Sequence, residues 1–167
     1  MLSEYGHQTT DEMGRAIVHR TGQGLDVTVP AMAERVGELR EAARAFAELH
    51  GVERPADVAL AITEACANVV MHAYLDHDPG PLRLSATRHD TAVTFVVGDD
   101  GTGLAPRPDS PGFGMGLPLI AQLSDHFELS DNGGRGTRVL MRFAIHQTAP
   151  RRSGTGDADC PRAIEQR

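Results

Sequence analysis

The residues best suited to chemistry lie in one apolar stretch, Ala56–Tyr74. From residue 58 to residue 73 almost every position is apolar, which is typical of a helix buried on all sides. Glu64 and Asn68 interrupt this pattern one helical turn apart, so a carboxylate and an amide share one face. Burying them without partners would cost roughly 1–3 kcal/mol for the amide and more for the charge. The sequence therefore predicts that this face lines a cavity holding water, a cation or a ligand.

Two glycine clusters follow this stretch. Asp99-x-Gly101-x-Gly103 ends a strand-like run, and a G-x-G-x-G segment at 112–116 precedes a helix-like run. Glycines let a backbone approach a ligand closely, and the N–H groups that begin a helix bind anions. Residues 114–117 therefore predict a phosphate cradle, and Asp99 is placed to accept a hydrogen bond from the amino group of a base. Each cluster alone is explained equally well by tight turns, and neither is a Walker A or dinucleotide-binding motif.

The elements that must position these residues follow from hydrophobic periodicity and turn signals. We expect an edge strand at 25–29, helices at 32–49, 56–74 and 117–123, a hairpin of strands at 82–87 and 92–97, and strands at 127–130 and 137–145. This order predicts an α+β two-layer sandwich, with a mixed, mostly antiparallel sheet and helices on one face.

Length and composition bound the remaining possibilities. The 167 residues fit one domain at 24–146, a disordered or loosely attached segment at 1–23 and a disordered tail at 147–167. A net charge of −7 argues against a nucleic-acid surface, and no apolar run predicts a membrane span or a signal peptide. Cys66 lies in the apolar stretch and Cys160 in the polar tail, so we expect no disulfide and a reducing cytoplasm.

Several segments resemble the motifs of the GHKL ATPase superfamily, the relatives of gyrase, histidine kinases and MutL. The pattern E-x-x-x-N-x-x-x-H-A-Y at 64–74 is similar to the N box. Segments 97–104 and 112–117 resemble the two glycine boxes, and Gly136-Thr137 resembles the terminal G-T element. The resemblance covers roughly 25–145 and implies the GHKL (Bergerat) ATP-binding fold. Within the superfamily the likeness is nearest to bacterial anti-sigma-factor serine/threonine kinases.

The resemblance implies a role for each matching residue. Asn68 would hold Mg²⁺ at the ATP phosphates, and Glu64 would be the general base for an incoming serine or threonine hydroxyl, or for water. Asp99 would bind the adenine amino group, and 105–111 would form the lid. The other nucleotide contacts would be His72, Gly101, Gly103, Gly114, Met115, Gly116, Leu117 and Thr137. For His72, a packed and hydrogen-bonded histidine explains the sequence equally well.

The resemblance also implies a function. The expected protein is an ATP-dependent anti-sigma factor and kinase that phosphorylates an anti-anti-sigma (STAS-type) protein and sequesters a sigma factor. Such proteins regulate transcription in the cytoplasm, usually as dimers, without contacting nucleic acid directly. Three alternatives stay open: a nucleotide-dependent binding module without kinase turnover, a simple ATPase, and a structural domain that binds no nucleotide.

Overall fold

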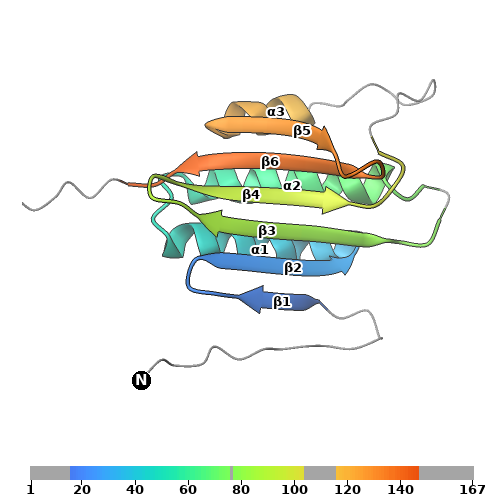
Figure 1. Cartoon of the computed structure of the whole chain (residues 1–167), viewed down its shortest axis with the longest axis horizontal. Coiled ribbons are helices and arrows are strands. Elements are labelled where there is room, and N and C mark those ends of the chain that lie inside the picture. Colours follow the sequence, from blue (N-terminus) through green and yellow to red (C-terminus); the bar gives the residue numbers. More distant parts are fainter. Residues whose placement is uncertain (1–15, 76, 104–115, 147–167) are drawn as a thin grey trace, which may run out of the picture.

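The computed structural model describes residues 16–75, 77–103 and 116–146. Within these ranges six strands form one sheet in the order β1-β2-β3-β4-β6-β5, with every neighbouring pair antiparallel (Figure 1). The elements are β1 (Ile17–Arg20), β2 (Gly24–Pro30), α1 (Ala33–Leu49), α2 (Pro55–His72), β3 (Pro81–Arg88), β4 (Ala92–Asp99), α3 (Gly116–Leu123), β5 (His126–Asp131) and β6 (Thr137–Ala144). No helix in this part of the chain is long and apolar enough to cross a membrane.

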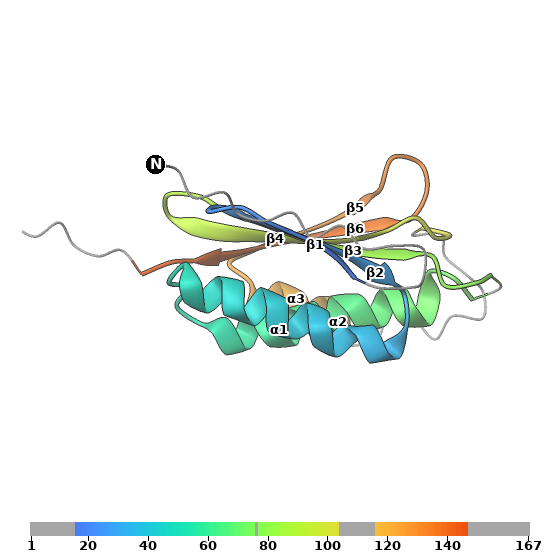
Figure 2. The ribbon, with the colours of Figure 1, turned by 90° about the horizontal axis from the view of Figure 1, so that it is seen from below.

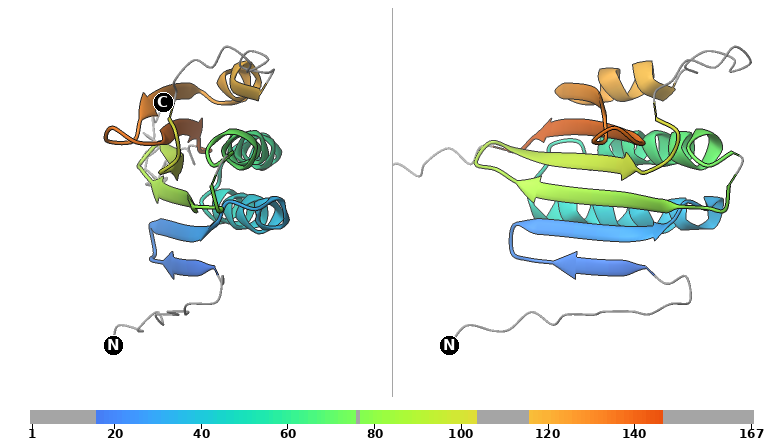
Figure 3. Two further views of the ribbon diagram at one scale, coloured as in Figure 1. Left: turned by 90° about the vertical axis from the view of Figure 1, so that its right-hand side faces the viewer. Right: turned by 45° about the vertical axis from the view of Figure 1, so that its right-hand side comes forward.

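The three helices lie together on one face of the sheet (Figure 2). Helix α2 is the central one and packs against both α1 and α3, as the end-on view in Figure 3 also shows. The predicted α+β two-layer fold with helices on one face of the sheet is therefore confirmed, and the sheet expected to be mixed and mostly antiparallel is antiparallel at every strand pair in the described residues. Helix α2 therefore contacts β4 of the sheet on one side and α3 on another.

The core lies between the two layers and follows from the period of two along each strand. Alternate residues of β2, β3, β4 and β6 are buried toward the helices, and α1 and α2 cover them with small and aliphatic side chains. Phe95 lies at its centre, with its ring edge-on to Phe46 of α1 and to Phe143 of β6. Because the strands are fixed by this core, the ends of β4 and β6 lie at defined positions beside α2.

Strand β1 contradicts the expectation of a disordered or loosely attached segment through residue 23. Ile17–Arg20 pairs antiparallel with β2, so β2 lies inside the sheet and is not the predicted edge strand. Three of the four β1 residues are exposed. The strand is thus held mainly by main-chain pairing, which leaves no hydrophobic pattern in the sequence. Residues 1–15 and 147–167 lie outside the described residues.

Helix α2 also differs from the expectation of burial on all sides. Its core side is fully buried, but Leu60 is 42% exposed and Met71 is 51% exposed. These two residues lie in the direction of Glu64 and Asn68, which are half-buried. The sheet and α1 cover the other sides of α2, whereas this flank is covered only in part by α3. The two polar side chains therefore line an accessible flank and not a closed interior.

Candidate functional site

The first half of the site forms where α3 begins against the middle of α2. A Cβ placed on Gly116 would lie 3.1 Å from Glu64 Oε2 and 3.3 Å from Asn68 Nδ2. The main chain of Gly116 thus packs directly on the carboxylate and the amide that the sequence singled out. Leu117 is half-buried and packs against the core. Because the N–H groups of a first helical turn lack partners within the helix, this end of α3 favours an anion.

The second half of the site is the acidic end of β4. Asp99 is 1% exposed, and it is the one buried charged residue in the part of the chain that the structure describes. Its Oδ1 accepts a hydrogen bond from the N–H of Gly101 at 2.8 Å, and the backbone of Thr137 supplies another. Burial raises the pKa of the Asp99 carboxyl, and these two hydrogen bonds partly oppose that shift. A carboxylate has about four acceptor positions, so Asp99 keeps acceptor capacity for a further donor.

Main-chain segments approach each other closely around Asp99. A Cβ on Gly101 would lie 2.2 Å from the carbonyl oxygen of Ala73, and the N–H of Thr102 donates to that same oxygen at 3.1 Å. Gly103 has a φ of +74°, and a Cβ there would lie 3.2 Å from the carbonyl oxygen of Gly136. The end of α2, the loop after β4 and the turn before β6 therefore meet at one point, and only glycines fit there.

The glycines of the β5–β6 turn provide a matched test of this close approach. Gly133 and Gly136 have φ values of +74° and +75°, but a Cβ on Gly133 meets nothing within 4 Å, whereas one on Gly136 would lie 2.0 Å from the carbonyl oxygen of Asp99. We expect Gly133→Ala to lower the free energy of unfolding by roughly 1–2 kcal/mol, from backbone strain alone. Gly136→Ala should lower it by about 2–5 kcal/mol because the clash adds to the strain. Urea unfolding of both variants measures the difference, and equal losses would contradict the contact.

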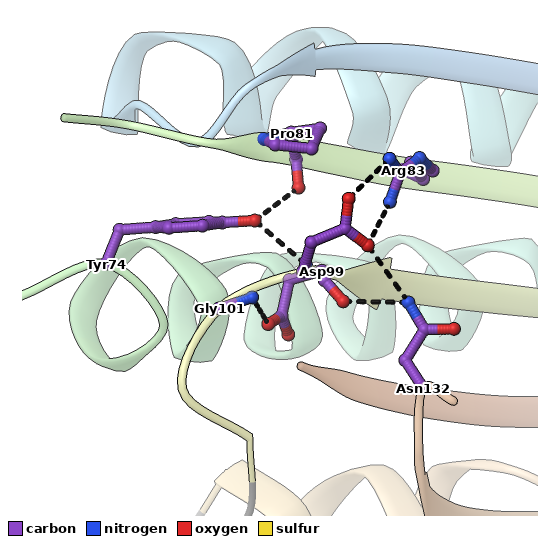
Figure 4. Close-up of polar contacts among 7 residues, drawn as sticks. Tyr74, Pro81, Arg83, Asp99, Gly101 and Asn132 are labelled. Atoms are coloured by element: carbon purple, nitrogen blue, oxygen red, sulfur yellow. Dashed lines mark hydrogen bonds and ion pairs between the residues drawn. The ribbon is translucent and has the colours of Figure 1, made fainter. Parts of the chain in front are cut away.

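A polar network that the sequence did not predict holds the main chain at the end of β4 (Figure 4). The hydroxyl of Tyr74 donates to the carbonyl oxygen of Pro81 and accepts from the N–H of Asp100, both at 2.9 Å. Arg83 donates to both carboxylate oxygens of Asp100, at 2.7 and 2.6 Å. Asn132 donates to the carbonyl oxygen of Asp99. The H-A-Y end of the first motif was a signal for Tyr74, but Arg83 and Asn132 stood in the sequence as ordinary strand and turn residues.

Helix α2 connects the two halves of the site. Asn68 and Ala73 are five residues apart, which is about 7.5 Å along the helix axis. Glu64, Asn68 and Gly116 thus gather beside the middle of α2, while Asp99, Gly101, Gly103 and Thr137 gather beside its end. His72 is exposed on the last turn of α2. The predicted contacts Gly114 and Met115, and the lid at 105–111, lie outside the described residues.

Asn68 is the one residue for which a metal role was predicted. In the described part of the chain no group of three or more His, Cys, Asp or Glu side chains could hold a metal ion. Magnesium that serves a nucleotide is usually bound by one or two protein oxygens together with phosphates and water. The side-chain oxygen of Asn68 lies next to the first turn of α3, 3.5 Å from the Cβ position of Gly116, and is a candidate for one such oxygen.

The antiparallel α+β sandwich, with a buried acid and a glycine turn beside its central helix, fits the ATP-binding fold that the sequence motifs imply. The sequence comparison agrees, because residues 29–143 match the family described as "Histidine kinase-like ATPase domain". The chain belongs to this family, and the resemblance drawn from the sequence motifs is confirmed.

Individual relatives carry two kinds of name. The chain is 31% identical over 141 residues to "Serine-protein kinase RsbW" of Halalkalibacterium halodurans, an alignment that covers 72% of this chain and 86% of the relative. It is 28% identical over 102 residues to "Anti-sigma F factor" of Clostridium novyi, covering 54% of this chain and 71% of the relative. A protein of the same name from Clostridium beijerinckii is 29% identical over 97 residues, covering 52% and 68%.

Proposed function

We propose that this protein is an ATP-dependent anti-sigma factor and serine/threonine kinase. It phosphorylates an anti-anti-sigma protein of the STAS type, and it sequesters a sigma factor. The observation that supports the proposal is the close approach of the Gly116 main chain, at the start of α3, to Glu64 and Asn68, which we propose as the base and the metal ligand. Family membership supports ATP as the substrate, and the names of the relatives support the kinase and anti-sigma roles.

The proposed ATP site has an adenine end and a phosphate end, and the residues at each suit that part of the nucleotide. The buried Asp99 carboxylate keeps lone pairs for the adenine amino group, and the absent side chain of Gly101 leaves its main chain against α2. About 7.5 Å back along α2, Asn68 and the first turn of α3 would hold the phosphates and Mg²⁺. When bound, the metal neutralises phosphate charge and orients the terminal phosphate. Gly101, Gly103 and Thr137 would shape the adenine side.

Glu64 would supply the base. It lies one helical turn from Asn68 on the same face of α2, and its Oε2 lies 3.1 Å from the Cβ position of Gly116, so the carboxylate would lie at the phosphate end of the nucleotide. Its Oε2 would take the proton of a serine or threonine hydroxyl as that oxygen bonds to the γ-phosphorus, and the bond from this phosphorus to the β–γ bridging oxygen would break, so that ADP leaves. The accessible flank around Leu60 and Met71 leaves room for a protein acceptor to approach.

Phosphotransfer to a partner tests the proposal. We expect the full chain, incubated with γ-labelled ATP, Mg²⁺ and anti-anti-sigma proteins from the same organism, to transfer label to one of them. Chelation of Mg²⁺ should abolish transfer. Steady phosphate release with no labelled acceptor would instead indicate a simple ATPase. Nucleotide binding and sigma-factor capture without either activity would indicate a binding module, and calorimetry that shows no ATP or ADP binding would reject all of these functions.

A further inference from the structure

Asn132, in the turn between β5 and β6, supports the main chain of Asp99. Its Nδ2 donates to the carbonyl oxygen of Asp99 at 2.8 Å and lies 3.3 Å from Oδ1 of Asp100. The β4–β6 ladder pairs residues only as far as Gly98 with Arg138. Asp99 still pairs with Leu82 of β3, but on the β6 side the ladder has ended, and there the side chain of Asn132 donates to the carbonyl oxygen of Asp99.

Asp100, the residue after Asp99, is also held by hydrogen bonds. The carboxylate of Asp100 receives two hydrogen bonds from Arg83, and its N–H donates to Tyr74. The peptide that joins Asp99 to Asp100 is therefore fixed from three directions: the end of α2, strand β3 and the β5–β6 turn (Figure 4).

Two of these supports, Arg83 and Asn132, act from the face of the sheet that lies away from the helices. Arg83 alternates with the buried residues Leu82 and Leu84, so its side chain lies on the opposite face. Arg83 and Asn132 both line a shallow cavity of about 200 Å³ on that face. The Asp99 carboxylate is instead buried with Oδ1 turned toward Gly101. Asn132 thus contacts the main chain of Asp99 and not its carboxylate.

We propose that Asn132 is a positioning residue that sets the base specificity of the site. The inference rests on the proposed binding of adenine by Asp99. By holding the Asp99 carbonyl, Asn132 restrains the position of the carboxylate, whose carbon is three bonds from the carbonyl carbon, and hydrogen bonds weaken steeply as their angle departs from linear. A misdirected carboxylate loses the adenine amino group, whereas the phosphate contacts at Asn68 and Gly116 stay in place.

The test compares ATP with inosine triphosphate (ITP), in which a carbonyl replaces the adenine amino group. Calorimetry in Mg²⁺ measures the affinity of both nucleotides for wild type, Asn132→Ala and Arg135→Ala. The last variant alters an exposed residue of the same turn. We expect Asn132→Ala to lower ATP affinity about fivefold and to change ITP affinity by less than about twofold, so that the preference for ATP shrinks. Arg135→Ala should retain the preference of wild type.

The outcomes separate this inference from the proposed function. An unchanged ATP preference in Asn132→Ala, or equal losses for both nucleotides, overturns the positioning role. A wild type that binds ATP and ITP equally overturns adenine recognition by Asp99 itself. Thermal unfolding reports whether Asn132→Ala is folded. If it is not, Arg83→Gln decides, because it releases the Asp100 carboxylate from an exposed ion pair and should reduce the ATP preference about twofold.

Discussion

Asp99→Asn is expected to weaken ATP binding by at least about 100-fold while leaving the protein folded. The carboxylate accepts from the N–H of Gly101 and from the backbone of Thr137, and in the proposed complex it also accepts from the adenine amino group. An amide has one oxygen in place of two, and its NH₂ group cannot accept. In either orientation, the NH₂ group of the amide therefore faces one of these donors. The site is buried, so the unmade hydrogen bond is costly.

Calorimetric titration with ATP and Mg²⁺ measures this loss, and circular dichroism checks the fold. Asp90→Asn is the matched control, because it removes the same charge from an exposed position in the β3–β4 turn. It should bind ATP as wild type does. Retention of wild-type affinity in Asp99→Asn would show that adenine is recognised elsewhere, even if the kinase activity were intact.

The same variant should gain stability relative to the unliganded wild type as the pH rises. Burial raises the pKa of the Asp99 carboxyl in the folded protein, so the stability that this group contributes is fully present below its unfolded pKa of about 3.9 and is lost as the pH rises through the folded value. Asn does not titrate. The free energy of unfolding of Asp99→Asn, relative to wild type, should therefore rise through this window and then level off. Urea unfolding between pH 3 and pH 7 measures it, and a relative stability that falls with pH would contradict the cause.

The sequence predicted the parts of the site that are local in the chain. Glu64 and Asn68 stand one turn apart on a helix whatever the tertiary structure, and the glycine spacing after β4 marks a turn wherever that turn lies. Family motifs then supplied roles for these residues. Asp99 was found in this way, although its burial depends on the end of α2 and the turn before β6.

Features that depend on pairing between distant segments were not predictable. Strand β1 has mostly exposed residues, so only its main-chain partner in β2 makes it a strand. Asn132 is an ordinary turn residue in the sequence, and its contact with Asp99 joins positions 33 residues apart. The apolar pattern of α2 similarly predicted full burial, because the pattern carries no information on which flank α3 leaves accessible.

Glu64→Gln is expected to reduce phosphotransfer by about 10²- to 10⁴-fold, the usual contribution of a general base, with ATP affinity within about twofold of wild type. Gln has the same shape and can still contact the first turn of α3, but it cannot take a proton from the incoming hydroxyl. Asn68→Ala should behave in the opposite way and weaken Mg²⁺-ATP binding itself, because it removes the oxygen proposed as the metal ligand.

A phosphotransfer assay at saturating ATP, combined with calorimetry, separates these two roles on one helix. Glu53→Gln makes the same chemical change at an exposed position before α2 and should transfer phosphate at the wild-type rate. If Glu64→Gln also keeps that rate, Glu64 is not the base, and the contact with Gly116 is structural. If the variant instead loses ATP affinity as Asn68→Ala does, the two side chains form one binding unit, and the base must come from another residue. If Glu64→Gln loses transfer with intact ATP binding, and Asn68→Ala loses the binding itself, metal and nucleotide binding belong to Asn68 and proton transfer to Glu64.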